Sequence, residues 1–99
     1  MFYHVSPRKN RGSILVSGIE PLFAVGTDHK VYLVEKHRLL WAIAHCSARH
    51  HIPVNELDIW TISHVPRVKR TNWNGVFITR CRVTPFDYEQ AERYCEQPR

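Results

Sequence analysis

Three segments of the sequence carry side chains that could recognise a nucleotide. His4 closes an expected first strand, Tyr32 lies in an expected second strand, and the loop from Arg70 to Asn74 precedes the expected last strand. If these strand ends meet across a small sheet, the imidazole suits a ribose hydroxyl, the phenol ring suits a heteroaromatic ring, and the loop suits a pyrophosphate. The alternative is structural: Tyr32 would pack in the core, and His4 would be a hydrogen-bonded strand end.

Other chemistries find less support in the spacing. Cys46 and His50 are four residues apart on an expected helix, which suits two ligands of a zinc ion. No second pair stands at a matching spacing, so we expect no metal site. His45 and Cys46 are adjacent, and adjacent helical residues do not face each other as a base and its nucleophile must. Neither of the glycine-rich phosphate-binding patterns occurs in the sequence.

The hydrophobic pattern and the turn residues predict one α+β domain over residues 1–99. Ser6 is a favourable N-cap and Pro7 a favourable first helical residue. The expected elements are a strand at 2–5, a helix from 7 to 17, a strand at 31–34, a helix at 37–51, and strands at 56–65 and 76–83. Alternation in the last strand places Arg80 and Arg82 on one face. The tail at 85–99 is weakly determined and suits at most a short helix. Together these elements predict a small mixed or antiparallel sheet with two main helices.

The charge is positive and uneven. The chain of 99 residues carries 14 Lys and Arg against 9 Asp and Glu, a net charge of +5, and residues 1–84 alone carry 12 basic and 5 acidic residues. A basic body suggests an anionic partner, such as a nucleotide, a nucleic acid or a phosphate group, although solubility explains the same charge. No stretch is long and apolar enough for a membrane span, and three widely spaced cysteines favour reduced thiols in the cytoplasm.

Four short motifs, taken in order, resemble a known superfamily. The segment YHVSPRKNRGSILVSGIEP resembles the strand–helix opening of the ADP-ribosyltransferase superfamily. The segments HKVYLVE, AHCSARHHIP and KRTNWNGVFITRCRVTP resemble parts of the NAD-binding C-terminal lobe of the RNA 2′-phosphotransferase family. The resemblance spans residues 2–88, and four motifs in the right order are more specific than any one of them. It implies an ADP-ribosyltransferase-like fold.

Residue by residue, the resemblance implies a set of NAD contacts. It implies that His4 contacts a ribose hydroxyl and that Ser6 helps to hold the nicotinamide side. Tyr32 falls where NAD-using transferases often have the tyrosine that stacks on nicotinamide. Arg70 lies near the family arginine, and Asn74 matches the family asparagine. His4 and Arg70 are the catalytic residues that this comparison implies.

The sequence departs from the catalytic patterns of both families. The transferases keep a glutamate near the start of the last core strand, where residues 72–74 contain no acid. Glu35 and Glu89 are the nearest acidic alternatives. Thr71, rather than Arg70, is the strict match to the family arginine. The RNA phosphotransferases also have a preceding lobe with further catalytic residues, and this sequence has no counterpart to it.

Two functions follow as hypotheses. The first is a minimal ADP-ribosyltransferase-like protein that binds NAD, as ligand or co-substrate, or another ADP-ribose-containing ligand. Such a protein would transfer ADP-ribose or phosphate to a nucleic-acid or protein target. The second is a non-catalytic module that kept the fold, lost the acid, and holds nucleic acid or a protein through residues 66–73. The side chains expected to contact phosphate or nucleic acid are Arg67, Lys69, Arg80 and Arg82; for the last two, a solvated strand face is the alternative.

Overall fold

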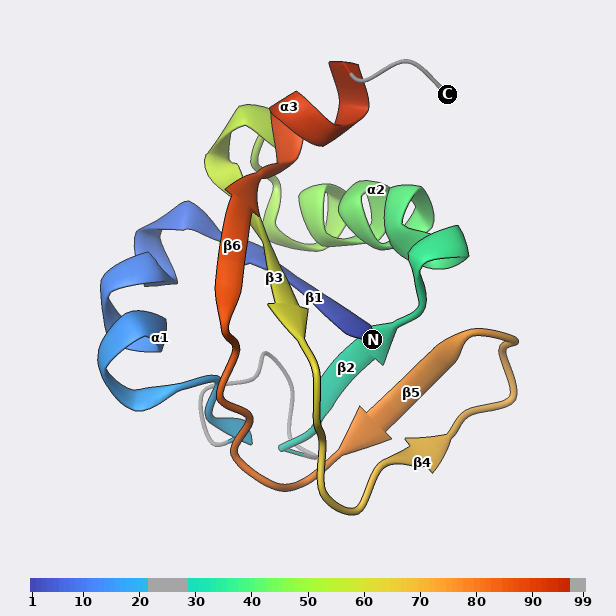
Figure 1. Cartoon of the computed structure of the whole chain (residues 1–99). Helices are drawn as coiled ribbons and strands as arrows, with labels where there is room; N and C mark the ends of the chain where they lie inside the picture. Colours follow the sequence, from blue (N-terminus) through green and yellow to red (C-terminus); the bar gives the residue numbers. More distant parts are fainter. Residues whose placement is uncertain (22–28, 97–99) are drawn as a thin grey trace.

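The structure is a computed structural model, and it describes residues 1–21 and 29–96. Its strands form an antiparallel sheet in the order β4-β5-β2-β1-β3-β6 (Figure 1). The strands are β1 (Phe2–Pro7), β2 (Val31–Val34), β3 (Leu57–Ile62), β4 (Lys69–Arg70), β5 (Val76–Thr79) and β6 (Asp87–Gln90). The helices are α1 (Arg11–Ser17), α2 (Leu39–His50) and α3 (Ala91–Glu96), with 3-10 turns at Arg8–Asn10, Lys36–Arg38 and Val54–Glu56. The predicted α+β class, with an antiparallel sheet and two main helices, is confirmed.

Side chains that alternate along the strands build a core on each face of the sheet. On one face, Ile14 of α1 belongs to a buried cluster with Leu33 and Trp60. On the other face, Ile43 of α2 belongs to a buried cluster with Ile59, and α3 joins the same cluster. We call these the α1 face and the α2 face. Helices cover both faces, as Figure 1 shows, which explains why five of the six residues of β3 are buried.

The two central strands share only a short ladder. β1 pairs with β3 along all six of its residues. With β2 it shares one register pair, Tyr3 opposite Val34. His4 is the first residue of β1 beyond that pair. We call the unpaired stretch between these strands the β1–β2 seam, and it places His4 at a gap in the middle of the sheet.

The first helix begins later than the sequence predicts, and the prediction that Ser6 caps it is wrong. β1 continues to Pro7, whose φ of −59° and ψ of 139° are extended, and a 3-10 turn precedes α1. Ser6 lies within the strand, where its hydroxyl accepts a hydrogen bond of 2.9 Å from Trp60 Nε1. A buried indole N–H requires an acceptor, and this requirement outweighs the capping preference of serine.

The last predicted strand is also longer than the observed one. β5 ends at Thr79, so the prediction that Arg80 and Arg82 share a face of this strand is wrong. The Thr79 hydroxyl donates to the Pro66 carbonyl and accepts from the Cys81 amide, both at 3.2 Å. These two hydrogen bonds stabilise a turn after Thr79, where β5 would otherwise continue its pairing.

The tail contains a strand as well as a helix. β6 pairs with β3 from Asp58 to Thr61 before α3 begins, whereas the sequence predicts at most a short helix. Residues 97–99, which end the predicted tail, lie outside the described residues. β6 is an edge strand with no buried residue, so its polar run DYEQ carries no apolar alternation that would predict a strand.

A buried carboxylate joins the first helix to the sheet. Asp58 of β3 is 0% exposed. Arg11 donates from Nε to Oδ2 at 2.9 Å and from Nη2 to Oδ1 at 2.6 Å, and Arg8 donates from Nε to Oδ1 at 3.2 Å. Arg8 also reaches Glu92 of α3 at 2.7 Å, and the Arg11 guanidinium lies 4.6 Å from the centre of the Tyr88 ring. This network fixes the chain directly after His4 and Ser6.

Candidate functional site

His4 is held in one orientation at the β1–β2 seam. Its Nδ1 lies 2.8 Å from the carbonyl oxygen of Tyr32. A carbonyl oxygen only accepts, so Nδ1 must carry the hydrogen, and Nε2 of the neutral ring carries a lone pair. Among the described residues, no hydrogen-bond partner faces Nε2. Removal from water lowers the pKa of His4, and the hydrogen bond to Tyr32 raises it by less. The ring is therefore neutral at pH 7 and offers an acceptor.

The Tyr32 ring points to the other side of the sheet. His4 is paired with Trp60 of β3, whose side chain packs on the α1 face. Val31 and Leu33 also pack on the α1 face, so Tyr32 between them points to the α2 face, where it is 49% exposed. The structure thus brings His4 to the backbone of Tyr32 and not to its ring. The sequence predicts that these two strand ends meet, and it does not assign the faces of their side chains.

Ser6 lies on the same face as His4, two residues further along β1. Its side chain is buried, at 5% exposure for the residue, and its hydroxyl is the acceptor of the Trp60 indole. That bond uses one lone pair of the hydroxyl and leaves its hydrogen able to donate. Ser6 therefore fixes Trp60 beside His4, and the burial of Ser6 makes it a support for the histidine position.

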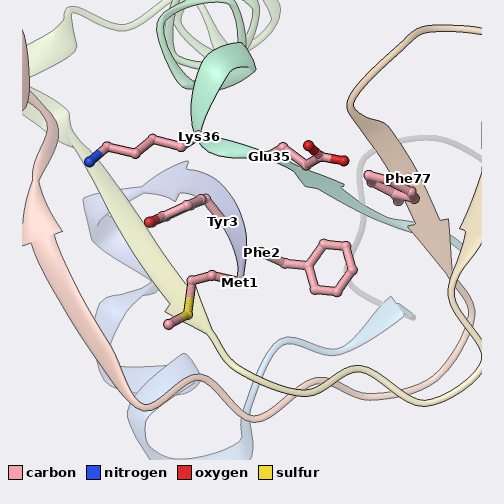
Figure 2. A pocket seen from close by; sticks show the side chains of 6 residues that line it. All are labelled: Met1, Phe2, Tyr3, Glu35, Lys36 and Phe77. Atoms are coloured by element: carbon pink, nitrogen blue, oxygen red, sulfur yellow. The ribbon is translucent and has the colours of Figure 1, made fainter.

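Two hollows that share Glu35 and Phe77 in their linings lie at the end of β2, and Figure 2 shows the residues that line the larger one. The larger, of about 380 Å³, is lined by Met1, Phe2, Tyr3, Glu35, Lys36 and Phe77. The smaller, of about 60 Å³, is lined by Glu35, Arg70, Thr71, Trp73, Asn74, Gly75, Val76 and Phe77. Figure 2 shows the rings of Phe2 and Phe77 from β1 and β5, which meet edge to face at 5.3 Å, below the Glu35 carboxylate. An aromatic hollow and a polar hollow thus share one carboxylate. His4 lines neither hollow, but it follows Phe2 on the same face of β1.

The turn between β4 and β5 positions the polar hollow. The Glu35 amide donates to the Gly75 carbonyl at 2.9 Å, and Arg38 Nε donates to the Asn74 carbonyl at 2.6 Å. Gly75 has a φ of +77°, and a Cβ there would lie 2.6 Å from the His37 ring. The turn therefore favours glycine at this position, because other residues rarely adopt a positive φ. The hydrogen bonds from the Glu35 amide and from Arg38 Nε bring the predicted loop to the end of β2.

The predicted phosphate contacts are spread from the β4 edge of the sheet to the chain beyond β5. Lys69 and Arg70 form β4, the edge strand, and both are exposed. Arg67 is exposed with a positive φ of 54°. Arg80 is exposed beyond the end of β5, and Arg82 lies 3.6 Å from the carboxylate of Glu20. Arg70 lines the polar hollow with Asn74, whereas the other four basic side chains line neither hollow.

An aromatic cluster that the sequence did not predict lies on α2 and the β4–β5 turn. Trp41 stacks on His45 at 5.1 Å and meets Trp73 edge to face at 5.0 Å. The Arg38 guanidinium lies 5.7 Å from the centre of the Trp41 ring. The spacing of Arg38, Trp41 and His45 on one helix could have indicated the first part of this cluster. The contact with Trp73 is tertiary and leaves no local signal.

The cysteine that the sequence paired with His50 is part of the core. Cys46 is buried, and its Sγ lies 3.7 Å from the Val5 carbonyl oxygen. Burial raises the pKa of the Cys46 thiol to about 11, so it is protonated and a weak nucleophile at neutral pH. Within residues 1–21 and 29–96, no three His, Cys, Asp or Glu side chains are grouped to hold a metal ion.

Comparisons with protein-family models, with curated proteins and with solved structures return no match for this chain. In the part of the chain that the structure describes, no helix is both long and apolar enough to cross a membrane. The function proposed below therefore rests on the residues and on the sequence resemblance.

Proposed function

We propose that this chain binds NAD or another ADP-ribose-containing nucleotide beside the β1–β2 seam. The observation that carries the proposal is the fixed orientation of His4, whose Nδ1–H is committed to the Tyr32 carbonyl. Its Nε2 lone pair suits a hydroxyl donor, which is what a ribose supplies. The sequence resemblance assigns the same contact to the same residue. Ser6 is buried on the same face of β1, and it supports the position of His4 through Trp60.

The hollows around Glu35 suit the remaining parts of such a ligand. Phe2 and Phe77 offer aromatic surface to a nicotinamide or adenine ring. Arg70 and Asn74 line the adjoining polar hollow, where a guanidinium can bind pyrophosphate oxygens. The Tyr32 ring points to the α2 face, on the other side of the sheet from the His4 side chain. It is therefore the weakest of the proposed ligand contacts.

Transfer of ADP-ribose from NAD is the reaction that we propose for this site, with phosphate transfer as the alternative. The transition state carries positive charge on the nicotinamide ribose, and a carboxylate stabilises it best. Glu35 is the carboxylate that both hollows share, and its side chain is 48% exposed. We assign that role to Glu35, with Arg70 at the phosphates. The acceptor would be a nucleic acid or a protein in the cytoplasm, where the three free cysteines would stay reduced.

Removal of the His4 ring should abolish stabilisation by NAD. For a dissociation constant of about 0.1 mM, NAD at about 1 mM adds about 1.4 kcal/mol to the free energy of unfolding. That corresponds to a rise in Tm of about 6–10 °C for a domain of this size. We expect this rise for the wild type and for His64→Ala, whose exposed side chain lies outside the hollows, and none for His4→Ala. Differential scanning fluorimetry with NAD and with ADP-ribose measures it, and an equal shift in His4→Ala contradicts the assignment.

The same shift should depend on pH in one direction. The pKa of His4 is lowered in the folded chain, so the neutral ring prevails above pH 6.5 and protonation follows only at lower pH. Protonation turns Nε2 from an acceptor into a donor. The NAD-dependent rise in Tm should therefore be constant above pH 6.5 and should decline as the pH falls through the lowered pKa.

Glu35→Gln should remove turnover and spare binding. Loss of a group that stabilises only the transition state costs about a hundredfold or more in kcat, while substrate binding is retained. We expect hydrolysis of NAD to fall to that extent in Glu35→Gln, with the NAD-dependent Tm shift retained. Glu89→Gln changes the other acidic alternative, on β6, and should keep wild-type turnover. Absence of turnover in the wild type, with binding intact, would overturn the reaction and leave the binding proposal standing.

A further inference from the structure

We propose that the aromatic cluster on α2 and the β4–β5 turn binds single-stranded nucleic acid by base stacking. We call Arg38, Trp41, His45 and Trp73 the tryptophan surface. This surface shares Trp73 with the lining of the polar hollow, but the proposal goes beyond the nucleotide site and does not depend on nucleotide binding. It extends the prediction made from residues 66–73, because three of the four members come from α2 and the turn that precedes it, outside that segment.

The tryptophan surface presents aromatic rings that are held in place. Trp41 packs partly against the core of the α2 face, and His45 stacks on it with an interplanar angle of 16°. Trp73 is 53% exposed. Its backbone is nevertheless fixed, since its amide binds the Thr71 hydroxyl at 3.1 Å and its carbonyl binds the Val76 amide at 3.1 Å. An exposed indole on a fixed backbone can stack on a base at a small cost in chain entropy.

A guanidinium is anchored at the edge of the same surface. Arg38 Nε donates to the Asn74 carbonyl at 2.6 Å, and the guanidinium lies over the Trp41 ring. The bond to Asn74 uses one of the five N–H groups of the arginine. The others can donate to a phosphate while the stem stays fixed. A cation next to stacking rings is the arrangement by which proteins hold an unpaired strand.

Basic residues outnumber acidic ones around the tryptophan surface, where Glu35 shares the polar hollow with Trp73. Residues 36–51, which include α2, carry three Lys and Arg and no Asp or Glu. Residues 63–84, which include the β4–β5 turn, carry five Lys and Arg and no Asp or Glu. Six of the nine acidic residues lie in 56–58 and 87–96, toward the opposite β6 edge of the sheet. A basic edge strand alone could serve to prevent strand pairing, but that role explains neither the helical basic residues nor the exposed indole.

The test is binding of labelled oligonucleotides, measured by fluorescence anisotropy. We expect oligo(U) and oligo(dT) of about 12 nucleotides to bind, and a duplex of the same length to bind less tightly because its bases are already stacked. Comparison of the two single strands decides between RNA and DNA. Trp73→Ala should weaken binding at least fivefold, about 1 kcal/mol. Trp73→Phe keeps a ring and should stay within about threefold of the wild type. Phe86→Ala, which removes another exposed aromatic ring, should change nothing.

Variants that remove basic side chains distinguish base stacking from phosphate contacts as the source of binding. Arg67→Gln with Lys69→Gln should lower the salt dependence of binding by about two phosphate contacts, whereas Arg93→Gln on α3 should not. His4→Ala should leave oligonucleotide affinity unchanged, so that failure of the nucleotide proposal and failure of this one are distinguishable. Absence of oligonucleotide binding, a preference for the duplex, or wild-type affinity in a folded Trp73→Ala variant would overturn the inference. Self-association that Trp73→Ala abolishes would also overturn it and would make this surface an interface between copies.

Discussion

Asp58→Ala should cost the protein about 3–5 kcal/mol in free energy of unfolding, the range expected when one partner of a buried ion pair is removed. Both carboxylate oxygens of Asp58 are bound by arginines, and the side chain is completely buried. Without it, Arg8 and Arg11 remain half-buried and charged, since the hydrogen bond with Glu92 raises the pKa of Arg8. Arg8 keeps its hydrogen bonds to Glu92 and to the Leu57 carbonyl, whereas Arg11 loses both of the hydrogen bonds that it donates to the Asp58 carboxylate.

Urea unfolding followed by circular dichroism measures this loss. Asp87→Ala on β6 is the control, because Asp87 is exposed and forms no ion pair with the described residues. We expect it to stay within about 0.5 kcal/mol of the wild type. Asp58→Asn keeps the shape and one acceptor, so it should fall between the two. Wild-type stability in Asp58→Ala would contradict this prediction. It would mean that hydrogen bonds to water or to Glu92 replace those to Asp58 with no loss in the free energy of unfolding.

Gly18→Ala and Gly12→Ala should change stability in opposite directions. Gly18 ends α1 with a φ of +79° and a ψ of −174°, a backbone region that is nearly restricted to glycine. A Cβ there would lie 2.8 Å from the Val83 carbonyl oxygen, which is itself bound by the Ile19 amide at 2.7 Å. Strain and clash together should cost at least about 2 kcal/mol. Gly12 lies in α1, and a Cβ added there would meet no atom within 4 Å, so alanine should add up to about 1 kcal/mol.

The same urea titration decides this pair. Because both substitutions add one methyl group, the difference between them isolates the backbone conformation and the contact with Val83. Equal effects would show that the chain after α1 can move away from Val83. The bridge between Ile19 and Val83 makes such movement costly, since it holds both backbone partners.

Local patterns were sufficient for most of the fold. The strand at Val31–Val34 and the start of β5 at Val76 were predicted to the residue, because apolar residues and an Asn-Gly turn define them within a few positions. The end of β5 was not, because it depends on the Thr79 hydroxyl and a distant carbonyl. The start of α1 was not, because Trp60 competes for the hydroxyl of Ser6. Both errors come from partners far away in the sequence.

The candidate site was predictable in its composition and not in its arrangement. His4 and Tyr32 do meet, and the Asn74 loop does reach the end of β2. β1 and β2 share a single register pair, and this register decides that His4 reaches the backbone of Tyr32. Residue types alone do not encode the register. Trp41 and Trp73 are 32 positions apart, so only the folded chain reveals their contact.

The short β1–β2 ladder has a mechanical consequence. It divides the sheet into two three-stranded halves, β4-β5-β2 and β1-β3-β6, which share one backbone pair and the imidazole bridge from His4 to the Tyr32 carbonyl. Such a sheet bends most easily along the line with the fewest backbone hydrogen bonds. The basic edge and the acidic edge of the molecule belong to different halves. The hydrophobic clusters on both faces span this line, so they hold the two halves together where the backbone ladder is short.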